Sequence, residues 1–481
     1  MKIAIVGGGW AGLSAAITAV DHGVEVHLYE SGSRLGGRAR SVDGKVLTPD
    51  ASTAKVLPDA FEATVWPEAI DNGQHILLGA YTATIHLMRR LGQDPDALFH
   101  HLPLNVQSAN GGFALKCTSR LPSPLHIAAG FLLAKGLTVT DKWSVLRAMQ
   151  QLKRDQWRTP KGATVQDWLQ QHRQSHRAET LLWEPLCIAT MNTPVNLACA
   201  QLFANVLRDS VGSADRSASN MLIPRVSLSE LWPDSVLALA GSELPSAATQ
   251  KASGNGLAGL RVRLSTTVKA ISLTEDTPES RIKLDGFPDQ YDAVIVACNT
   301  PSSARLLEQL PPVKGSAPLI AALTAFRHAP IATLTLQFSR PWQLPGPMLM
   351  LHEDRARGHF GQWLFRGQKD EHKLVHIVIS DAGELASRPR KEAVACLVEQ
   401  LEEQLRVNPS APMPPITAHA LIIEKRATFL AVPGLKRPGH RTPWRGVWLA
   451  GDWTDTGYPA VLEGAVRSGR DAVREMLGLR S

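Results

Sequence analysis

Cysteine is scarce in this chain, and its few cysteines follow no pattern that pairs thiols or binds a metal. None lies in a Cys-x-x-Cys motif, and the distances between them along the chain are irregular. These features exclude a disulfide scaffold and a cysteine-based metal centre, so we expect no metal and buried thiols in a reducing compartment. The five residues are Cys117, Cys187, Cys199, Cys298 and Cys396.

Long apolar runs are also missing. No stretch reaches the roughly eighteen apolar residues that a membrane-spanning helix needs. The first twenty residues resemble a secretory signal in composition, but their glycine triplet and the strand that follows argue against cleavage there. We therefore expect a cytoplasmic protein that is at most peripheral to the inner face of a membrane.

Blocks of like charge are absent, although the formal net charge is +7 and the pI is about 9.2. Scattered Lys and Arg residues do not predict a nucleic-acid partner, whereas a weak attraction to an anionic membrane surface is expected. The chain has the composition of a globular protein, with 481 residues of which 44% are hydrophobic. That length predicts two or three domains with ample core.

A glycine-rich stretch near the N-terminus predicts a strand, a tight turn and a helix. Lys2–Val6 reads as a short buried strand, Leu13–His22 as a helix, and Val24–Tyr29 as a second strand. The N-terminus of such a helix offers unpaired N–H groups and a partial positive charge to phosphates. The residues predicted to contact a dinucleotide pyrophosphate are Gly7, Gly9, Trp10, Ala11 and Gly12.

Each position in this fingerprint has a steric or chemical reason. Gly7 permits the turn, Gly9 lets the backbone approach a pyrophosphate, and Gly12 lets the helix pack on the strand. Glu30 follows Gly12 by eighteen residues and can accept hydrogen bonds from both ribose hydroxyls, while it repels a 2′-phosphate. The alternative is an ordinary βαβ turn that binds no ligand.

The fingerprint continues in the stretch Arg-Leu-Gly-Gly-Arg at residues 34–38. Gly36 and Gly37 let the chain pass close to a bound cofactor. Arg34 and Arg38 offer guanidinium groups to phosphate oxygens.

The C-terminal region carries a second signal. Gly446–Ala450 reads as a strand that leads directly into Gly451 and Asp452. An Asp in this position can accept a hydrogen bond from a polyol hydroxyl, although a simple strand-to-turn junction is the alternative. From Pro459 onward, apolar residues recur at helical spacing, and the N-terminus of that helix supplies positive potential for a reduced flavin ring. The predicted contacts there are Glu463, Gly464 and Ala465.

The pattern along the chain predicts one α/β domain assembled from separate segments. Residues 1–84, 215–310 and 425–481 are expected to form a Rossmann-like cofactor domain. Arg261–Ile271 alternates like a strand, and Tyr291–Ala297 is a continuous apolar run. Residues 85–214, mainly helical, and 311–424, with strands and a long helix, are expected to form an α+β substrate domain.

These motifs together resemble the superfamily of FAD-dependent amine oxidases and carotenoid desaturases. The resemblance implies FAD as cofactor, with Glu30 at the adenosine ribose, Arg34 and Arg38 beside the pyrophosphate, and Asp452 at the ribityl or pyrophosphate region. It also implies that Val268 holds the adenine through backbone atoms. Many amine oxidases carry an Arg where this chain has Gly32, which counts against that branch but not against FAD.

Further segments resemble a subfamily. Residues 71–81, which include Gly73 and His75, are similar to the DxGxH…GxY stretch of plant-type carotene desaturases. Residues 183–194, 221–225 and 361–365 look like the hydroxysqualene dehydroxylases, the squalene-associated desaturase relatives of hopanoid-producing bacteria. The resemblance implies a thirty-carbon isoprenoid substrate, from which an allylic hydroxyl leaves as water while hydride from flavin N5 replaces it. The electron donor that reduces the flavin is not indicated.

The residue that would protonate the leaving hydroxyl is not defined by any motif, and strong local polarisation is an alternative to an acid. His75 is the candidate catalytic residue, because it lies in the motif expected beside the flavin and histidine titrates near neutral pH. The alternative is a histidine that packs against backbone or cofactor. Asp71 either orients His75 or caps a turn.

The apolar stretch Leu125–Leu137 also has two interpretations. It predicts either an amphipathic helix that rests on a membrane or a core helix of the substrate domain. At the level of function, a polyene desaturase, an amine or porphyrinogen oxidase, a non-catalytic prenyl-lipid carrier and a nicotinamide dehydrogenase remain as alternatives. The C-terminal motif argues against the last two, since neither needs it.

Overall fold

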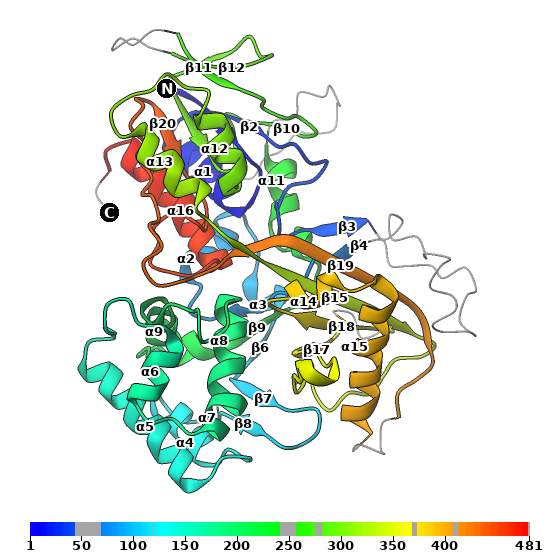
Figure 1. Cartoon of the computed structure of the whole chain (residues 1–481). Helices are drawn as coiled ribbons and strands as arrows, with labels where there is room; N and C mark the ends of the chain where they lie inside the picture. The colour runs from blue at the N-terminus through cyan, green and yellow to red at the C-terminus, as the bar shows by residue number, and fades with distance from the viewer. Residues whose placement is uncertain are drawn as a thin grey trace.

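A five-stranded parallel sheet forms the upper part of the molecule in the computed structural model (Figure 1), which describes residues 1–43, 69–118, 120–240, 256–274, 281–367, 373–406 and 412–479. The strand order is β10-β2-β1-β14-β20. In chain order this is 3-2-1-4-5, so the connections reverse direction between β1 and β14, where open α/β sheets bind ligands. The strands are β1 (Lys2–Val6), β2 (Glu25–Tyr29), β10 (Leu260–Arg263), β14 (Ala293–Val296) and β20 (Val447–Leu449).

One predicted strand is wrong. Arg261–Ile271 is not continuous, because β10 ends at Arg263 and β11 (Ile271–Leu273) belongs to a separate antiparallel sheet with β12 (Ile282–Leu284) and β13 (Gln290–Tyr291). Ser265 has a φ of 50°, and its N–H donates to the Gly32 carbonyl over 2.9 Å. This bend turns the chain away from the parallel sheet. Apolar and polar residues alternate on both sides of this bend because β10 and β11 each have one buried face.

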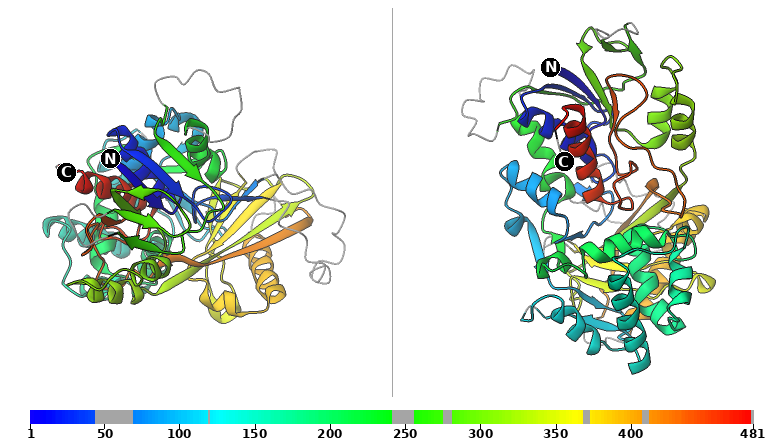
Figure 2. Two further views of the ribbon diagram at one scale, coloured as in Figure 1. Left: turned by 90° about the horizontal axis from the view of Figure 1, so that it is seen from above. Right: turned by 90° about the vertical axis from the view of Figure 1, so that its left-hand side faces the viewer.

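The two ends of the chain pack against each other through helices α1 (Trp10–Asp21) and α16 (Leu462–Met476), which are adjacent in both views of Figure 2. A Cβ on Gly469 would lie 2.0 Å from the Ala11 carbonyl oxygen, so the helix backbones are in direct contact. The Ser14 hydroxyl donates to the Val466 carbonyl over 2.7 Å. The predicted helix after Pro459 is therefore present and lies beside the N-terminal fingerprint.

A second, antiparallel sheet lies in the lower part with the order β16-β17-β18-β15-β19. Helices α14 (Gly383–Ser387) and α15 (Arg390–Leu405) cover one of its faces, where Leu334, Ile377 and Leu401 are buried in one core. The long strands β15 and β19 extend from this sheet toward the parallel one (Figure 1). The strands are β15 (His328–Phe338), β16 (Met348–Met350), β17 (Trp363–Arg366), β18 (Leu374–Ile379) and β19 (Ile416–Phe429).

The helical part predicted for residues 85–214 forms the remaining lobe, at the lower left of Figure 1. Trp168 and Trp183 pack edge to face in its core, with ring centroids 5.5 Å apart. Its main helices are α4 (Leu125–Leu132), α5 (Val139–Arg154), α6 (Val165–Gln171), α7 (His176–Ala178), the π-helical turn η3 (Glu179–Trp183), α8 (Glu184–Met191) and α9 (Ala200–Asp209). No helix among the described residues is both long and apolar enough to cross a bilayer.

Short elements connect these parts. A small sheet joins β5 (Leu77–Leu78), β9 (Met221–Pro224) and β6 (Phe99–Leu102), and two hairpin-like pairs join β3 (Ser41–Asp43) with β4 (Ala69–Asp71) and β7 (Asn105–Gln107) with β8 (Ala114–Lys116). The connecting helices are α2 (Thr82–Arg90), α3 (Pro95–Leu98), η4 (Arg216–Ser219), α10 (Leu228–Leu231), α11 (Pro233–Leu239), α12 (Thr300–Leu307), α13 (Ser316–Thr324) and η5 (Arg355–Arg357). The parallel sheet draws strands from all three segments of the predicted cofactor domain, and the division into two domains remains a prediction.

Candidate functional site

The glycine turn after β1 has the geometry that a pyrophosphate requires. Gly7 has a φ of 114°, and a Cβ on Gly12 would lie 1.9 Å from the Gly7 carbonyl oxygen. Gly9 is the N-cap of α1, which no side chain caps, and the nearest atom to a Cβ there is 3.8 Å away. The first amides of α1, at Trp10, Ala11 and Gly12, therefore lack intrahelical partners.

The second glycine pair lies directly over this turn. The N–H of Gly36 donates to the Gly8 carbonyl over 2.9 Å, and a Cβ on Gly37 would lie 2.9 Å from the Gly9 Cα. Both glycines have positive φ, 105° for Gly36 and 63° for Gly37. The structure thus brings the two glycine motifs into contact. Arg34 is exposed, and its charge partly opposes the rise that burial causes in the pKa of Asp234, a residue of α11.

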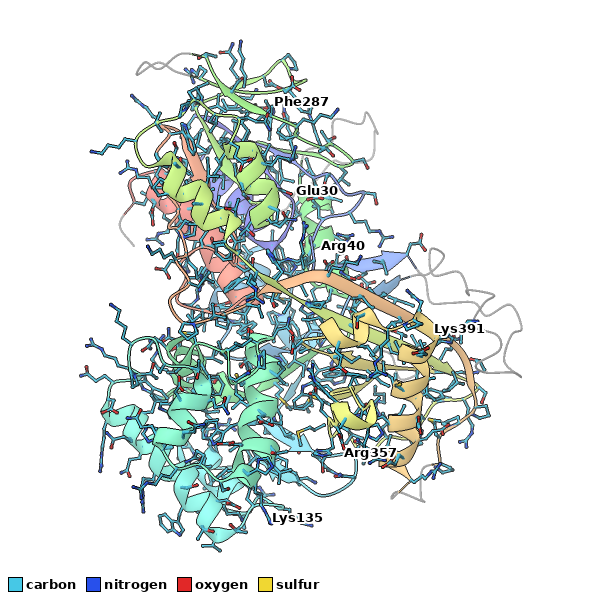
Figure 3. The ribbon with its side chains drawn as sticks, viewed as in Figure 1. Glu30, Arg40, Lys135, Phe287, Arg357 and Lys391 are labelled. Carbon is cyan, nitrogen blue, oxygen red and sulfur yellow. The ribbon has the colours of Figure 1, made fainter. Side chains whose placement is uncertain are left out.

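Glu30 lies at the end of β2, in the upper part of the molecule (Figure 3). Its carboxylate accepts the N–H groups of Gly8, over 2.6 Å, and of Gly32, over 2.7 Å. The Ser31 hydroxyl donates to the same carboxylate over 3.2 Å. A carboxylate has about four lone-pair positions, so one remains for a ribose hydroxyl. The Glu30 carbonyl accepts the N–H of Thr266 over 2.8 Å, which ties the loop that carries buried Val268 to the same corner.

An ion pair joins the N-terminal and C-terminal motifs. Nη2 of Arg38 donates to Oδ1 of Asp452 over 2.7 Å, and its Nη1 donates to the Ala427 carbonyl over 2.6 Å. Asp452 is 6% exposed, so Arg38 supplies the charge that a buried carboxylate needs. Residues 414 positions apart in the chain thus meet beside the glycine turn.

We expect the substitution Asp452→Ala to loosen FAD more than it lowers stability. The variant removes an acceptor for cofactor hydroxyls and leaves the Arg38 guanidinium without its carboxylate. A charged hydrogen bond of this kind contributes about 1.5–3 kcal/mol, so FAD affinity should fall by roughly tenfold or more. Titration of the apoprotein with FAD measures this effect. Unchanged affinity would remove Asp452 from the cofactor site.

The Glu463 side chain is engaged by contacts within the protein. Its carboxylate accepts the N–H groups of Ala83 and Thr84, each over 3.0 Å, and the Thr84 hydroxyl over 2.8 Å. Arg467 donates to it as well. The side chain therefore caps the N-terminus of α2 and is fully engaged there. The N–H of Ala465 donates to the Val461 carbonyl over 3.1 Å, so only the backbone amides of Glu463 and Gly464, in the uncapped first turn of α16, are without intrahelical partners and can face a cofactor.

Gly451 and the loop that follows are held from two sides. The N–H of Gly451 donates to the Ser468 hydroxyl of α16 over 2.8 Å. Across the loop, the half-buried guanidinium of Arg437 donates to the carbonyls of Asp452, Trp453, Thr454 and Tyr458. Burial lowers the pKa of Arg437 to about 10. No motif predicted this arginine, because it acts on backbone carbonyls that carry no sequence signal.

His75 lies at the edge of the same site. Its Nδ1 contacts the Gly73 carbonyl at 3.0 Å, which assigns the ring proton to Nδ1, because a carbonyl only accepts. Burial is the largest cause that lowers the pKa of His75, and the charge of Arg38 adds to it. In the neutral form of the ring, Nε2 is an acceptor, and the role of His75 as a proton donor remains a prediction.

Asp71 does not orient His75. Its Oδ1 accepts the Ser41 hydroxyl over 2.8 Å and the N–H of Leu228, in the first turn of α10, over 2.9 Å. The interpretation as a capping residue is therefore the one that the structure supports. Asn72 links the segment to the cofactor motifs, since its Nδ2 donates to the Arg38 carbonyl over 3.2 Å.

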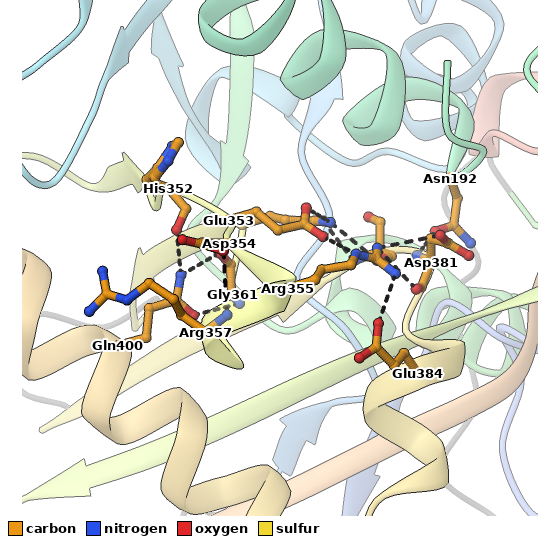
Figure 4. Close-up of polar contacts among 12 residues, drawn as sticks. Asn192, His352, Glu353, Asp354, Arg355, Arg357, Gly361, Asp381, Glu384 and Gln400 are labelled. Atoms are coloured by element: carbon orange, nitrogen blue, oxygen red, sulfur yellow. Dashed lines mark hydrogen bonds and ion pairs between the residues drawn. The ribbon is translucent and has the colours of Figure 1, made fainter. Parts of the chain in front are cut away.

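The subfamily segments around Asn192 and Gln362 meet in one polar network between the helical lobe and the lower sheet (Figure 4). Asn192 ends α8 in the left-handed conformation, and its Oδ1 accepts the N–H of Asp381 over 2.7 Å. Arg355 pairs with Glu353 and Asp381, and Gln362 donates to Glu353 over 2.8 Å. These residues join the helical lobe to the lower sheet. This structural role accounts for them without a direct part in the reaction.

Comparison with known proteins gives a full-length match. The family described as flavin containing amine oxidoreductase matches residues 10–477. The chain is 27% identical to a hydroxysqualene dehydroxylase of Rhodopseudomonas palustris, over 97% of this chain and 96% of that protein. It is 24% identical to a zeta-carotene desaturase of Zea mays, over 100% of this chain and 85% of that protein.

Solved structures share the fold. An oxidoreductase from Methanosarcina mazei superposes with a TM-score of 0.66 at 14% identity, over 99% of this chain and 100% of that one. Cyclohexylamine oxidase from Brevibacterium oxydans superposes with a TM-score of 0.63 at 18% identity, over 99% of each chain. The predicted fold class, a Rossmann-like α/β unit of the amine-oxidase type, is confirmed.

Proposed function

The chain belongs to the flavin-containing amine oxidoreductase family, and on that premise we propose that it removes the hydroxyl group of hydroxysqualene to yield squalene. It is a FAD-dependent oxidoreductase, which settles its class against a lipid carrier or a nicotinamide dehydrogenase. The observation that carries the proposed substrate is the similarity, over nearly the whole chain, to three proteins named hydroxysqualene dehydroxylase. Such a reaction serves squalene and hopanoid biosynthesis.

The residues described above divide the work of binding and orientation. The amides of α1 and the guanidinium of Arg38 would hold phosphate oxygens, Glu30 would hold the ribose, and Asp452 would orient the ribityl region. The flavin, when bound in its reduced form, supplies hydride from N5 to the allylic carbon. The chain's own task is to hold a long apolar substrate, exclude water and bind the hydroxyl that leaves.

The balance of the reaction is simple. One C–O bond breaks and one C–H bond forms from the delivered hydride. The oxygen leaves as water with one proton, which fully reduced flavin would supply besides its hydride. Hydroxide is a poor leaving group, so donors must face the oxygen. His75 presents an acceptor in its neutral form, and we assign it to orient the substrate hydroxyl.

A single-turnover experiment tests this function. Chemically reduced holoenzyme, mixed anaerobically with hydroxysqualene, should reoxidise its flavin and form one squalene per flavin, as measured by absorbance and mass spectrometry. The similarity to zeta-carotene desaturases favours one rival, a polyene desaturase, whose substrate would instead reduce the oxidised enzyme. Reduction of the flavin by zeta-carotene, with no squalene formed from hydroxysqualene, would establish that rival.

A lipid substrate has to leave a membrane, and the helical lobe carries a surface suited to bind a membrane. Six large apolar side chains with 36–80% exposure lie within residues 121–143, at the lower end of the molecule near Lys135 (Figure 3). We name this surface the apolar tip: Leu121, Leu125, Leu132, Leu133, Val139 and Trp143. In α4, His126 and Phe131 pack inward while Leu125 and Leu132 face solvent, so the helix is amphipathic.

The charges around the apolar tip favour an anionic bilayer as its occupant. The basic residues Lys135, Lys142 and Arg147 flank it, and Nζ of Lys142 lies close to the tip, where it donates to the Leu132 carbonyl. The one acid in this stretch, Asp141, is 6% exposed and caps α5 through Thr138. Exposed apolar groups ringed by positive charge bind anionic lipid surfaces.

The double substitution of Leu133 and Trp143 by Ser should weaken binding to vesicles of phosphatidylcholine and phosphatidylglycerol by roughly tenfold or more, since each side chain contributes about 1.5–3 kcal/mol when fully buried. Vesicle sedimentation measures the effect. The matched control replaces Leu197 and Leu237, which are 42% and 37% exposed outside the tip, and should leave binding unchanged. Equal binding by both double variants would exclude the apolar tip as the lipid contact.

A further inference from the structure

The lower sheet presents a second face, opposite the one that α15 covers. Residues alternate along β15, so Ala332, Leu334 and Leu336 pack toward α15 while Thr333, Thr335 and Gln337 face the other way. The register pairs Thr333 with Val378, and Val378 with Trp363. Thr333 and Trp363 thus share one row and one face, with their Cα atoms roughly 10 Å apart across two strand spacings.

This row carries two buried polar atoms that none of the described residues satisfies. Thr333 is 1% exposed and Trp363 is 9% exposed. Oγ1 of Thr333 and Nε1 of Trp363 have no hydrogen-bond partner among the residues that the structure describes. A buried donor without a partner destabilises a protein, and such groups are rare. In the next row, by contrast, the Thr335 hydroxyl pairs with His376 Nδ1 at 3.0 Å.

The row of Thr333 and Trp363 has apolar neighbours on one side. On its other side lies the segment that contacts the cofactor motifs. Met350 and Phe365 lie on the same face and are buried in the core cluster that also holds Val378. At the other side, a Cβ on Gly73 would lie 3.7 Å from Thr333 Oγ1 and 3.6 Å from the Cε1 atom of His75. Thr333 is therefore adjacent to the segment that approaches Arg38 and Asp452.

We propose that Thr333 Oγ1 and Trp363 Nε1 bind the hydroxyl oxygen of the substrate, an assignment that rests on the proposed function. An indole N–H only donates, and a threonine hydroxyl donates as well as accepts, so the pair suits an alcohol oxygen and gains nothing from a hydrocarbon. As the C–O bond breaks, negative charge grows on that oxygen, and fixed donors in a dry site stabilise it until it takes a proton and leaves as water. The pair supplies the polarisation that no acidic motif provides.

Oxidised holoenzyme tests binding without turnover, because it holds no hydride. Titration with hydroxysqualene and with squalene, followed by the flavin absorbance, gives the preference for the alcohol as the ratio of the two Kd values. Thr333→Val and Trp363→Phe should each lower this preference about fivefold to tenfold, with squalene affinity unchanged. Thr335→Val, the same change one row away on the same face, should leave the preference intact.

Stability gives a second readout that does not involve the substrate. Thr333→Val replaces an unsatisfied hydroxyl by a methyl group of the same shape, so the Tm should stay equal or rise. Thr335→Val breaks the bond to His376, so the Tm should fall. A fall in Tm for Thr333→Val would show that its hydroxyl has a structural partner and would overturn the assignment.

The remaining outcomes separate the two proposals. If the wild type converts hydroxysqualene but both variants keep its preference for the alcohol, the assignment is wrong and the function stands. If either variant loses FAD or shifts the flavin absorbance without substrate, the atoms serve the cofactor and the assignment is wrong. If the wild type neither prefers nor converts hydroxysqualene, the proposed function and the assignment are both wrong.

Discussion

Gly469→Ala should cost the protein most of its bound FAD and about 3 kcal/mol of stability. The added Cβ would lie 2.0 Å from the carbonyl oxygen of Ala11 and 2.8 Å from the backbone nitrogen of Ala15. Both atoms belong to the backbone of α1, which cannot move aside as a flexible side chain can. The helices must separate, which weakens the hydrogen bond from Ser14 to Val466 and shifts the start of α1, where the pyrophosphate is expected.

The measurement is the thermal midpoint together with the ratio of FAD to protein after purification. Gly383→Ala is the matched control, because Gly383 lies in a helix and a Cβ there meets nothing within 4 Å. That control should be neutral or more stable by up to about 1 kcal/mol. If Gly469→Ala matched it in both readouts, α1 and α16 would not be in contact in solution.

Arg437→Met should lower FAD affinity by at least about a hundredfold. The guanidinium bridges four backbone carbonyls and the Thr456 hydroxyl within residues 452–458, and it stacks 4.8 Å from the Phe429 ring centre. Methionine keeps much of the volume but leaves those carbonyls without a donor, and each unsatisfied group costs about 1–3 kcal/mol. The loop that carries Asp452 would then lose its conformation.

Three variants make this prediction specific. Arg437→Lys keeps the charge but provides one compact ammonium in place of a planar fork, so it should restore FAD affinity only in part. Lys436→Met changes the exposed neighbour and should bind FAD as the wild type does. Titration of the apoproteins with FAD compares them. Wild-type affinity in Arg437→Met would show that the loop does not depend on this arginine.

Features of the fold that depend on a few adjacent residues could be predicted from the sequence, whereas others could not. The strand Lys2–Val6 and the turn at Gly7 were predicted correctly, because each depends on a few adjacent residues whose sterics are readable. The break at Ser265 was missed, because the alternation on both sides of it looked like one strand. The predicted contacts of individual residues with FAD, and the two-domain division, remain predictions.

The amino-acid sequence by itself determined the family, the cofactor and the fold class, since the glycine turn, Glu30 and the segment after β20 are short motifs with their own stereochemistry. Tertiary structure alone decided which partner each side chain meets. Glu463 caps a helix 380 positions away, and Thr333 shares a row with Trp363 only through the register of three strands. Such pairings arise from packing between distant segments, which local patterns do not encode.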